Sequence, residues 1–194
     1  RFLEGLLLAL TETHPHWKLS VALDYQGALP SSLTGKVETT LLPKWPELYW
    51  PKIATGFDLF ISPYPKLPLL TLPCPAIHTV HDVFYLTHVA YQEKHWRNIM
   101  GKWVLRRSVA KAKLTWFVSL ASQQACEALI GPVTPAKVRY SPVETSFSPS
   151  SGQEMTGESA YFLCVGNGLP HKNLEVIIKA VHGSEIQVKC VGVT

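Results

Sequence analysis

A histidine and an aspartate, His81 and Asp82, directly follow the short apolar run at residues 76–80. A run of this length predicts a buried strand, and ligands of open α/β sheets bind where the strands end. A histidine beside a carboxylate can orient a sugar hydroxyl or move a proton. His81 and Asp82 are therefore candidate catalytic residues. The structural alternative, that Asp82 caps a turn and His81 is an ordinary loop histidine, stays open.

A second candidate site lies at residues 165–174, where a glycine-rich turn follows an apolar run and leads into a helical pattern. Asn173 is the predicted N-cap of that helix. Lys172 then stands at the positive end of the helix dipole, which is unfavourable unless an anion is bound there. A phosphate would be held by Lys172 and by the N–H groups of the first turn. The alternative is an exposed loop lysine. The turn is not a P-loop, because no G-x-x-x-x-G-K-[ST] pattern is present.

A long helix predicted at residues 91–113 is strongly basic. Three large apolar side chains recur along it at a spacing that predicts a core-facing stripe: Trp96, Met100 and Trp103. Its cations are Lys94, Arg97, Lys102, Arg106, Arg107, Lys111 and Lys113. These charges indicate either a solvated face or contact with anionic lipid or a charged acceptor. No recognition motif supports nucleic acid as the partner.

The composition is that of a globular α/β protein. The chain has 194 residues, 46% of them apolar, and a net charge of +4, which suits an anionic ligand or an anionic membrane surface. The longest uncharged apolar stretch, residues 67–80, contains three prolines and falls short of the roughly 20 residues of a membrane span. No secretory signal is predicted.

The cysteine pattern predicts free thiols. None of the four cysteines forms a C-x-x-C pair, and Cys164 and Cys190 lie in apolar runs that predict core strands. Unpaired, reduced cysteines favour the cytosol. Zinc requires clustered ligands, which the sequence does not offer. The cysteines are Cys74, Cys126, Cys164 and Cys190.

Strand and helix patterns alternate along the chain, which predicts a mainly parallel, doubly wound sheet. Strands are predicted at 19–23, 37–42, 58–62, 76–80, 114–118 and 138–141, and helices at 1–10, 46–54, 91–113 and 122–130. The stretch 146–159 is polar and rich in serine and glycine, as linkers are. The alternation then restarts with a strand at 161–165, a helix at 173–181 and a strand at 186–191.

This pattern predicts three parts. Residues 1–143 form a Rossmann-like domain whose first strand is missing, residues 144–159 form a linker, and residues 160–194 open a second Rossmann-like domain. We expect both ends to be cut. Residue 1 already lies in a helical pattern, and one β-α-β unit leaves a sheet face and an edge uncovered.

Several runs, in a consistent order along nearly the whole chain, resemble the retaining glycosyltransferases of family 4, particularly the mannosyltransferase-like members. "YFLCVGNGLPHKNLEVIIKA" at 161–180 is similar to the opening of the donor-binding domain, and "IHTVHDVFYLTH" at 77–88 to the histidine-aspartate segment of the first domain. "DLFISPY" at 58–64, "FVSLAS" at 117–122 and "SPVETSFSP" at 141–149 fit the same family.

The resemblance implies a GT-B architecture, in which two Rossmann-like domains enclose the active site. His81 would lie beside the transferred sugar and Lys172 would hold the donor diphosphate, with Gly166 letting the diphosphate approach the backbone. Asn167 takes the place of an arginine often found after that glycine, and Ser141-Pro142 replaces the usual Asn-Gly of the interdomain turn. The paired glutamates of the donor domain are absent from the chain.

The implied activity is transfer of mannose or a similar hexose from a nucleotide-sugar to an acceptor hydroxyl, with retention and without a metal or other cofactor. The acceptor would be a glycan or a lipid-linked molecule, as in polysaccharide biosynthesis. We expect a cytoplasmic protein, with peripheral membrane contact through helix 91–113, and an inactive fragment when the chain stands alone. Two alternatives remain open: a catalytically inactive GT-B-like binding protein and a GT-B-like sugar-nucleotide epimerase.

Overall fold

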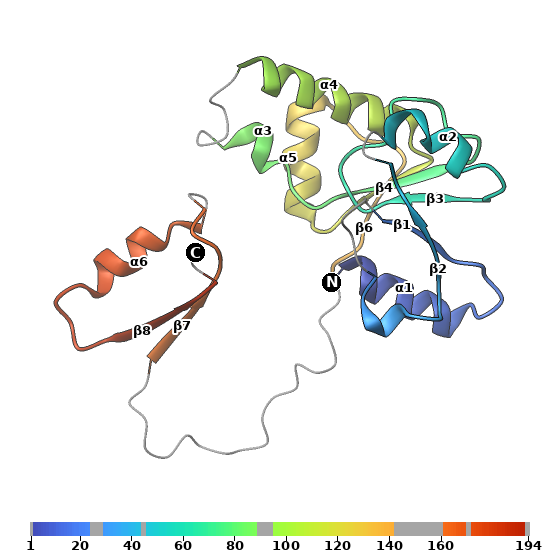
Figure 1. Ribbon diagram of the computed structural model, residues 1–194. Helices are drawn as coiled ribbons and strands as arrows, with labels where there is room; N and C mark the ends of the chain where they lie inside the picture. Colours follow the sequence, from blue (N-terminus) through green and yellow to red (C-terminus); the bar gives the residue numbers. More distant parts are fainter. Residues whose placement is uncertain are drawn as a thin grey trace.

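The computed structural model describes residues 2–23, 29–43, 46–88, 95–141, 161–169 and 172–192, which form a mixed α/β structure (Figure 1). Its strands form three sheets, and every pairing in them is parallel. The first unit, Phe2 to Ser141, contains two of these sheets, and the second unit, Tyr161 to Gly192, contains the third. Residues 142–160, between the two units, lie outside the described ranges.

The four-stranded sheet of the first unit has the order β3-β4-β5-β6. Helix α4 links β4 to β5, and helix α5 links β5 to β6, as expected for parallel neighbours. The strands are β3 (Phe60–Ser62), β4 (Ala76–Val80), β5 (Leu114–Phe117) and β6 (Ala136–Val138), and the helices are α4 (His95–Lys111) and α5 (Leu120–Ile130). The core between them consists of Val80, Val83, Leu86, Leu105, Phe117, Cys126 and Val133.

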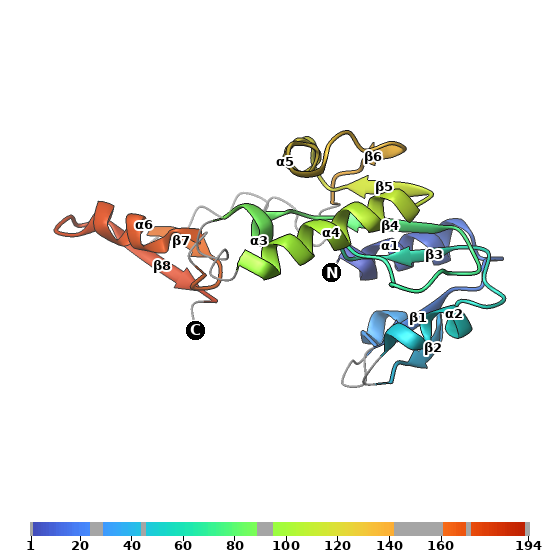
Figure 2. The same cartoon turned by 90° about the horizontal axis from the view of Figure 1, so that it is seen from above.

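A smaller sheet pairs β1 (Ser20–Leu23) with β2 (Glu38–Leu41). The strand predicted at 19–23 is thus confirmed within one residue. Its side chains Leu19, Val21 and Leu23 belong to one apolar cluster with Leu7 of α1 (Phe2–Thr13). The 3-10 helix η1 (Ser31–Leu33) adds Leu33 to that cluster. Helices α1 and α4 lie on opposite sides of the strands (Figures 1 and 2).

Several predicted bounds were wrong. The helix predicted at 46–54 is divided into η2 (Pro46–Leu48) and α2 (Trp50–Ile53), and helix α3 (Phe84–Thr87) was not predicted. Helix α5 begins at Leu120, two residues early, because the Ser119 side chain accepts a hydrogen bond from the Ser122 N–H and caps it. The strand predicted at 138–141 is β6, Ala136–Val138, whose register is set by pairing with β5.

Helix α4 does not bury the predicted stripe, because Trp96, Met100 and Trp103 are all exposed. The buried side chains of α4 are instead Leu105 and Ser108, on a face that also carries Gly101. A Cβ on Gly101 would lie 2.6 Å from Leu86 Cδ2, so the missing side chain allows α3 to approach α4 closely. The packed face of α4 thus combines Leu105 with the small residues Gly101 and Ser108. Residues 91–94 of the predicted helix lie outside the described ranges.

The second unit consists of β7 (Tyr161–Val165), α6 (Leu174–Val181) and β8 (Gln187–Val191), with β7 and β8 paired in parallel. None of its described residues is buried. Cys164 and Cys190 were expected in core strands, but Cys164 is half-buried and Cys190 is exposed, and they are neighbours in register across the two strands. The predicted linker at 146–159 lies outside the described residues.

All four cysteines are free thiols in the structure. Within the described ranges, no helix combines the length and the apolar character that crossing a bilayer requires.

Candidate functional site

His81 lies at the carboxyl end of β4, as the apolar run before it predicted. Its side chain is half-buried, with Nε2 3.1 Å from the carbonyl oxygen of Pro63, which follows β3. The ring of Phe2, at the start of α1, meets the imidazole edge-on at a centroid distance of 5.1 Å. Two elements remote in sequence therefore orient the His81 ring.

The contact with Pro63 determines which nitrogen of His81 carries a proton. A carbonyl oxygen only accepts hydrogen bonds, so Nε2 must donate. In the neutral imidazole, Nδ1 then carries the lone pair. Nδ1 is therefore the atom of His81 that can accept a hydrogen bond or a proton from a substrate hydroxyl.

Two serines at the start of α5 fix the backbone of His81. Ser122 Oγ donates to the His81 carbonyl oxygen at 2.6 Å, and the Ser119 and Ser122 hydroxyl oxygens are 2.8 Å apart. Because the hydroxyl hydrogen of Ser122 is used on His81, Ser119 is the donor of the bond between them. The chain Ser119–Ser122–His81 thus joins the carboxyl ends of β5 and β4. The sequence predicted a strand that ends at residue 118 and a helix that starts at Ser122, but gave no indication that Ser122 contacts His81.

Asp82 is exposed, and its Oδ1 accepts a hydrogen bond of 3.1 Å from the Phe84 N–H at the start of α3. This is the turn-capping role weighed as the alternative for Asp82. Its other carboxylate oxygen can still meet a ligand, so a catalytic role for Asp82 stays a prediction.

His78, three residues before His81, is a core residue. Its side chain is fully buried, and Nε2 lies 3.0 Å from Thr115 Oγ1 of β5. Burial lowers the pKa of His78 from 6.5 to about 4, so the imidazole is neutral near pH 7. Nδ1 of His78 has no hydrogen-bond partner among the described residues. His78 therefore contributes to packing beneath the site.

The second candidate site follows β7. Gly166 continues that strand's ladder by donating its N–H to the Val191 carbonyl at 2.9 Å. The Lys172 side chain lies beside Gly166, since a Cβ on Gly166 would be 3.8 Å from Lys172 Cγ and Cδ. Gly192 also packs close to Gly166, because a Cβ added to Gly192 would lie 3.1 Å from the Gly166 carbonyl oxygen. Gly166 is therefore half-buried, with the stem of Lys172 against it.

Helix α6 begins at this turn. Asn173 is its N-cap residue, as predicted, but adopts a left-handed conformation (φ 49°, ψ 39°) and makes no side-chain capping bond. The Lys172 N–H bonds to the Leu169 carbonyl at 2.9 Å, which closes the turn. Asn167 and Lys172 are exposed, and His171 lies outside the described residues. An uncapped helix start with an adjacent lysine is an arrangement that suits an anion.

The structure thus assembles two separate groups of the predicted site residues. His81 and Asp82 are in the first unit, and Gly166, Asn167 and Lys172 are in the second. Within the described ranges, no three His, Cys, Asp or Glu side chains gather to hold a metal ion. The positioning residues missed by the sequence are Phe2, Pro63, Ser119 and Ser122.

Comparisons of the chain with protein-family models, with curated proteins and with solved structures found no match.

Proposed function

We propose that this chain is part of a nucleotide-sugar-dependent glycosyltransferase of the GT-B type, which transfers a hexose such as mannose with retention. The observation that carries the proposal is the turn from β7 to α6. There the Lys172 stem lies along Gly166, and the N-cap residue Asn173 makes no side-chain capping bond. The family resemblance of residues 161–180 assigns the donor diphosphate to the same place.

In this proposal the leaving diphosphate is stabilised by charge and by the helix dipole. Lys172 supplies a cation, and N–H groups at the start of α6, other than that of Val176, which donates to the Asn173 carbonyl, supply donors to the same anion. Gly166 leaves room for the phosphates to approach the backbone. Donors that are in place before the reaction stabilise the charge that develops on the leaving group.

His81 acts on the sugar side of the same reaction. Its Nε2 is engaged with Pro63, so Nδ1 meets a sugar hydroxyl and holds the donor in place while the acceptor hydroxyl attacks. Asp82 shapes the turn into α3 through its bond to Phe84. In an enzyme with both domains complete, replacing His81 by alanine should lower kcat by roughly 10²-fold.

The exposed stripe of α4 supports contact with a membrane that carries the acceptor. Four large apolar side chains are exposed along this stripe: Trp96, Ile99, Met100 and Trp103. The Arg97 guanidinium lies 5.6 Å from the centre of the Trp96 ring. Aromatic side chains next to cations suit the interface of an anionic bilayer. Binding to vesicles rich in phosphatidylglycerol should fall when Trp96 and Trp103 are both replaced by serine, and binding that persists unchanged would contradict the proposal.

Amide chemical-shift mapping of the isotope-labelled chain tests the diphosphate site. GDP, UDP and ADP are titrated in turn, each with the corresponding monophosphate as the control. We expect the largest shifts at Gly166, Asn167, Gly168 and Lys172, and clearly smaller shifts with the monophosphates. Shifts that are absent, or that scatter over the first unit, would overturn the assignment.

A further inference from the structure

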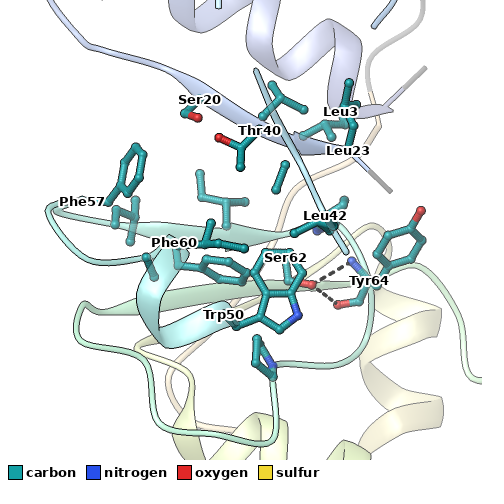
Figure 3. Close-up of a pocket in the computed structure, with 18 of the residues that line it drawn as sticks. Leu3, Ser20, Leu23, Thr40, Leu42, Trp50, Phe57, Phe60, Ser62 and Tyr64 are labelled. Carbon is teal, nitrogen blue, oxygen red and sulfur yellow. Dashed lines mark hydrogen bonds between the residues drawn. The ribbon is translucent and has the colours of Figure 1, made fainter. Parts of the chain in front are cut away.

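Among the described residues, no thiol or imidazole lines the cavity of the first unit. This cavity has a volume of about 560 Å³ and lies between the two sheets, where Figure 3 places Ser20 of β1 across from Phe60 of β3. Two cysteines instead lie next to each other in the second unit, in the neighbouring strands β7 and β8 (Figure 1). These are Cys164 and Cys190, and both are free thiols.

The two thiols share one face of the β7-β8 sheet. Cys164 is the register partner of Cys190, and directly opposite residues of paired strands point to the same side. A separate contact supports this assignment, because the Lys189 ammonium lies 3.7 Å from the centre of the Tyr161 ring. Lys189 and Tyr161 are therefore together on one face, and the alternation along each strand puts both cysteines on the other.

The spacing of the two strands suits a bond between the sulfurs. Neighbouring strands lie about 4.8 Å apart, and disulfides join residues whose Cα atoms are between about 4.4 and 6.8 Å apart. Because side chains stand roughly perpendicular to a sheet, the two Cβ atoms are also about 4.8 Å apart, whereas a disulfide holds them at about 3.8 Å. Forming the bond therefore requires the strands to approach by about 1 Å at this position.

The surroundings of the pair permit this approach. None of the described residues of the second unit is buried, and Cys190 itself is exposed. The other two cysteines are different, because burial raises the pKa of the Cys126 thiol to about 11 and also raises the pKa of Cys74. Both stay protonated near pH 7, and a protonated thiol is a poor nucleophile.

We propose that Cys164 and Cys190 form a reversible disulfide by exchange with a low-molecular-weight disulfide such as glutathione disulfide. The exposed Cys190 thiolate attacks first, so that its sulfur bonds to one glutathione and the other glutathione leaves as the thiol. The Cys164 thiolate then attacks the Cys190 sulfur and releases the second glutathione. The two cysteines lose two protons and two electrons, and glutathione disulfide takes up both.

The disulfide acts on the turn that follows β7. Val191, next to Cys190, accepts the Gly166 N–H at 2.9 Å. Gly192 already packs closely there, since a Cβ added to it would lie 3.1 Å from the Gly166 carbonyl oxygen. Drawing the two cysteines together therefore shifts the backbone of Gly166, with the Lys172 stem beside it. This inference does not depend on the proposed transferase activity.

The test is oxidation of the whole chain with glutathione disulfide, followed by an acid quench and a thiol count in denaturant. The four free thiols of the reduced chain should fall to two, and dithiothreitol should restore all four. Peptide mapping by mass spectrometry should find the link between Cys164 and Cys190. In denaturing urea the preference for this pair should disappear, because the paired strands hold the two thiols together.

Single substitutions test the order of the two steps. Cys164→Ser should stop at the mixed disulfide, with one glutathione bound to Cys190. Cys190→Ser should react little, because the exposed thiol is missing. Cys74→Ser is the matched control and should form the link between Cys164 and Cys190 as the wild type does.

Amide chemical shifts measure the effect on the turn without any nucleotide. Oxidation of the wild type should move the Gly166 and Gly192 amides and leave that of Ser122 in the first unit unchanged. The same treatment should leave all three amides of Cys190→Ser in place.

Three results would overturn the proposal. Four thiols that stay free, or a glutathione that stays on Cys190 in the wild type, would show that the pair does not close. A link that involves Cys74 or Cys126 instead would assign the reactive pair elsewhere. Unmoved Gly166 and Gly192 amides in the linked protein would show that the disulfide does not act on the turn.

Discussion

Two β-α-β units of this chain have the same local design and very different surroundings. In β4-α4-β5, His78, Thr79, Val80 and Phe117 are all fully buried, while in β7-α6-β8 no described residue is buried. The β4-α4-β5 unit has β3, β6 and α5 as neighbours, whereas β7-α6-β8 consists of one helix against two strands. Local apolar pattern is therefore enough to form a strand, but burial depends on the elements packed around it.

The two candidate sites differ in the same way. His81 is held by contacts from Phe2, Pro63 and Ser122, which come from three remote segments. Lys172 contacts its own turn. We therefore expect the side chains around His81 to keep their positions without a ligand. The side chain of Lys172 should adopt a single conformation only when an anion is bound.

A pair of phenylalanine truncations should give the largest difference between the units. Phe117 of β5 is 0% exposed and Phe162 of β7 is 66% exposed, and both lie in parallel strands. Phe117→Ala should lower the free energy of unfolding by about 3–5 kcal/mol, and Phe162→Ala should change it by less than about 0.5 kcal/mol. Urea denaturation measures both, and similar costs would show that the second unit has a core of its own.

Acid should weaken the first unit through His78. Because burial lowers the folded-state pKa of His78 to about 4, the unfolded chain binds an extra proton between pH 6.5 and 4. This contribution to stability is present above pH 6.5 and is lost as the pH falls to 4, by about 3 kcal/mol. In His78→Gln the loss between these pH values should be smaller by that amount, and parallel pH profiles would contradict the prediction.

A smaller effect is expected from the serine that fixes His81. Ser122→Ala removes the bond to the His81 carbonyl and should cost about 1 kcal/mol, with a change in the His81 ring resonances. Ser184→Ala in the second unit is the control, because Ser184 Oγ also donates to a carbonyl, that of Val181, but is exposed. Its effect on stability should be close to zero. Unmoved His81 resonances in Ser122→Ala would mean that Ser122 does not position the site.

The sequence predicted the strands best where short apolar runs are bounded by polar or turn residues. The bounds of β4 and β7 are confirmed to the residue. Strand β6 was misplaced, because its middle residue, Lys137, is exposed and breaks the apolar pattern. The packed face of α4 was missed because Gly101 and Ser108 form much of it, and neither stands out by hydropathy.

The sequence predicted those features of the candidate sites that depend on residues close together in the chain. Strand ends located His81 and the turn at Gly166, since both follow apolar runs. The partners of His81 were not predictable, because the bond from Ser122 spans 41 positions in the sequence and the Phe2 contact spans more than half of the first unit. Such contacts follow from the sheet order, which hydropathy does not specify.

The central claim is that the turn between β7 and α6 binds the diphosphate of a nucleotide-sugar. Calorimetric titration of GDP, UDP and ADP into wild type, Lys172→Ala and Lys179→Ala tests it most directly. Lys179 is the matched control, an exposed lysine of the same helix that pairs with Glu175 at 2.6 Å. Lys172→Ala should weaken binding of the preferred diphosphate by about 1.5–3 kcal/mol, while Lys179→Ala should leave it unchanged. The ligand-free Lys172→Ala protein should melt at the same temperature as wild type or slightly higher, because a cation at a helix start opposes the dipole. Equal affinity in wild type and Lys172→Ala, or a marked loss of ligand-free stability in that variant, would contradict the claim.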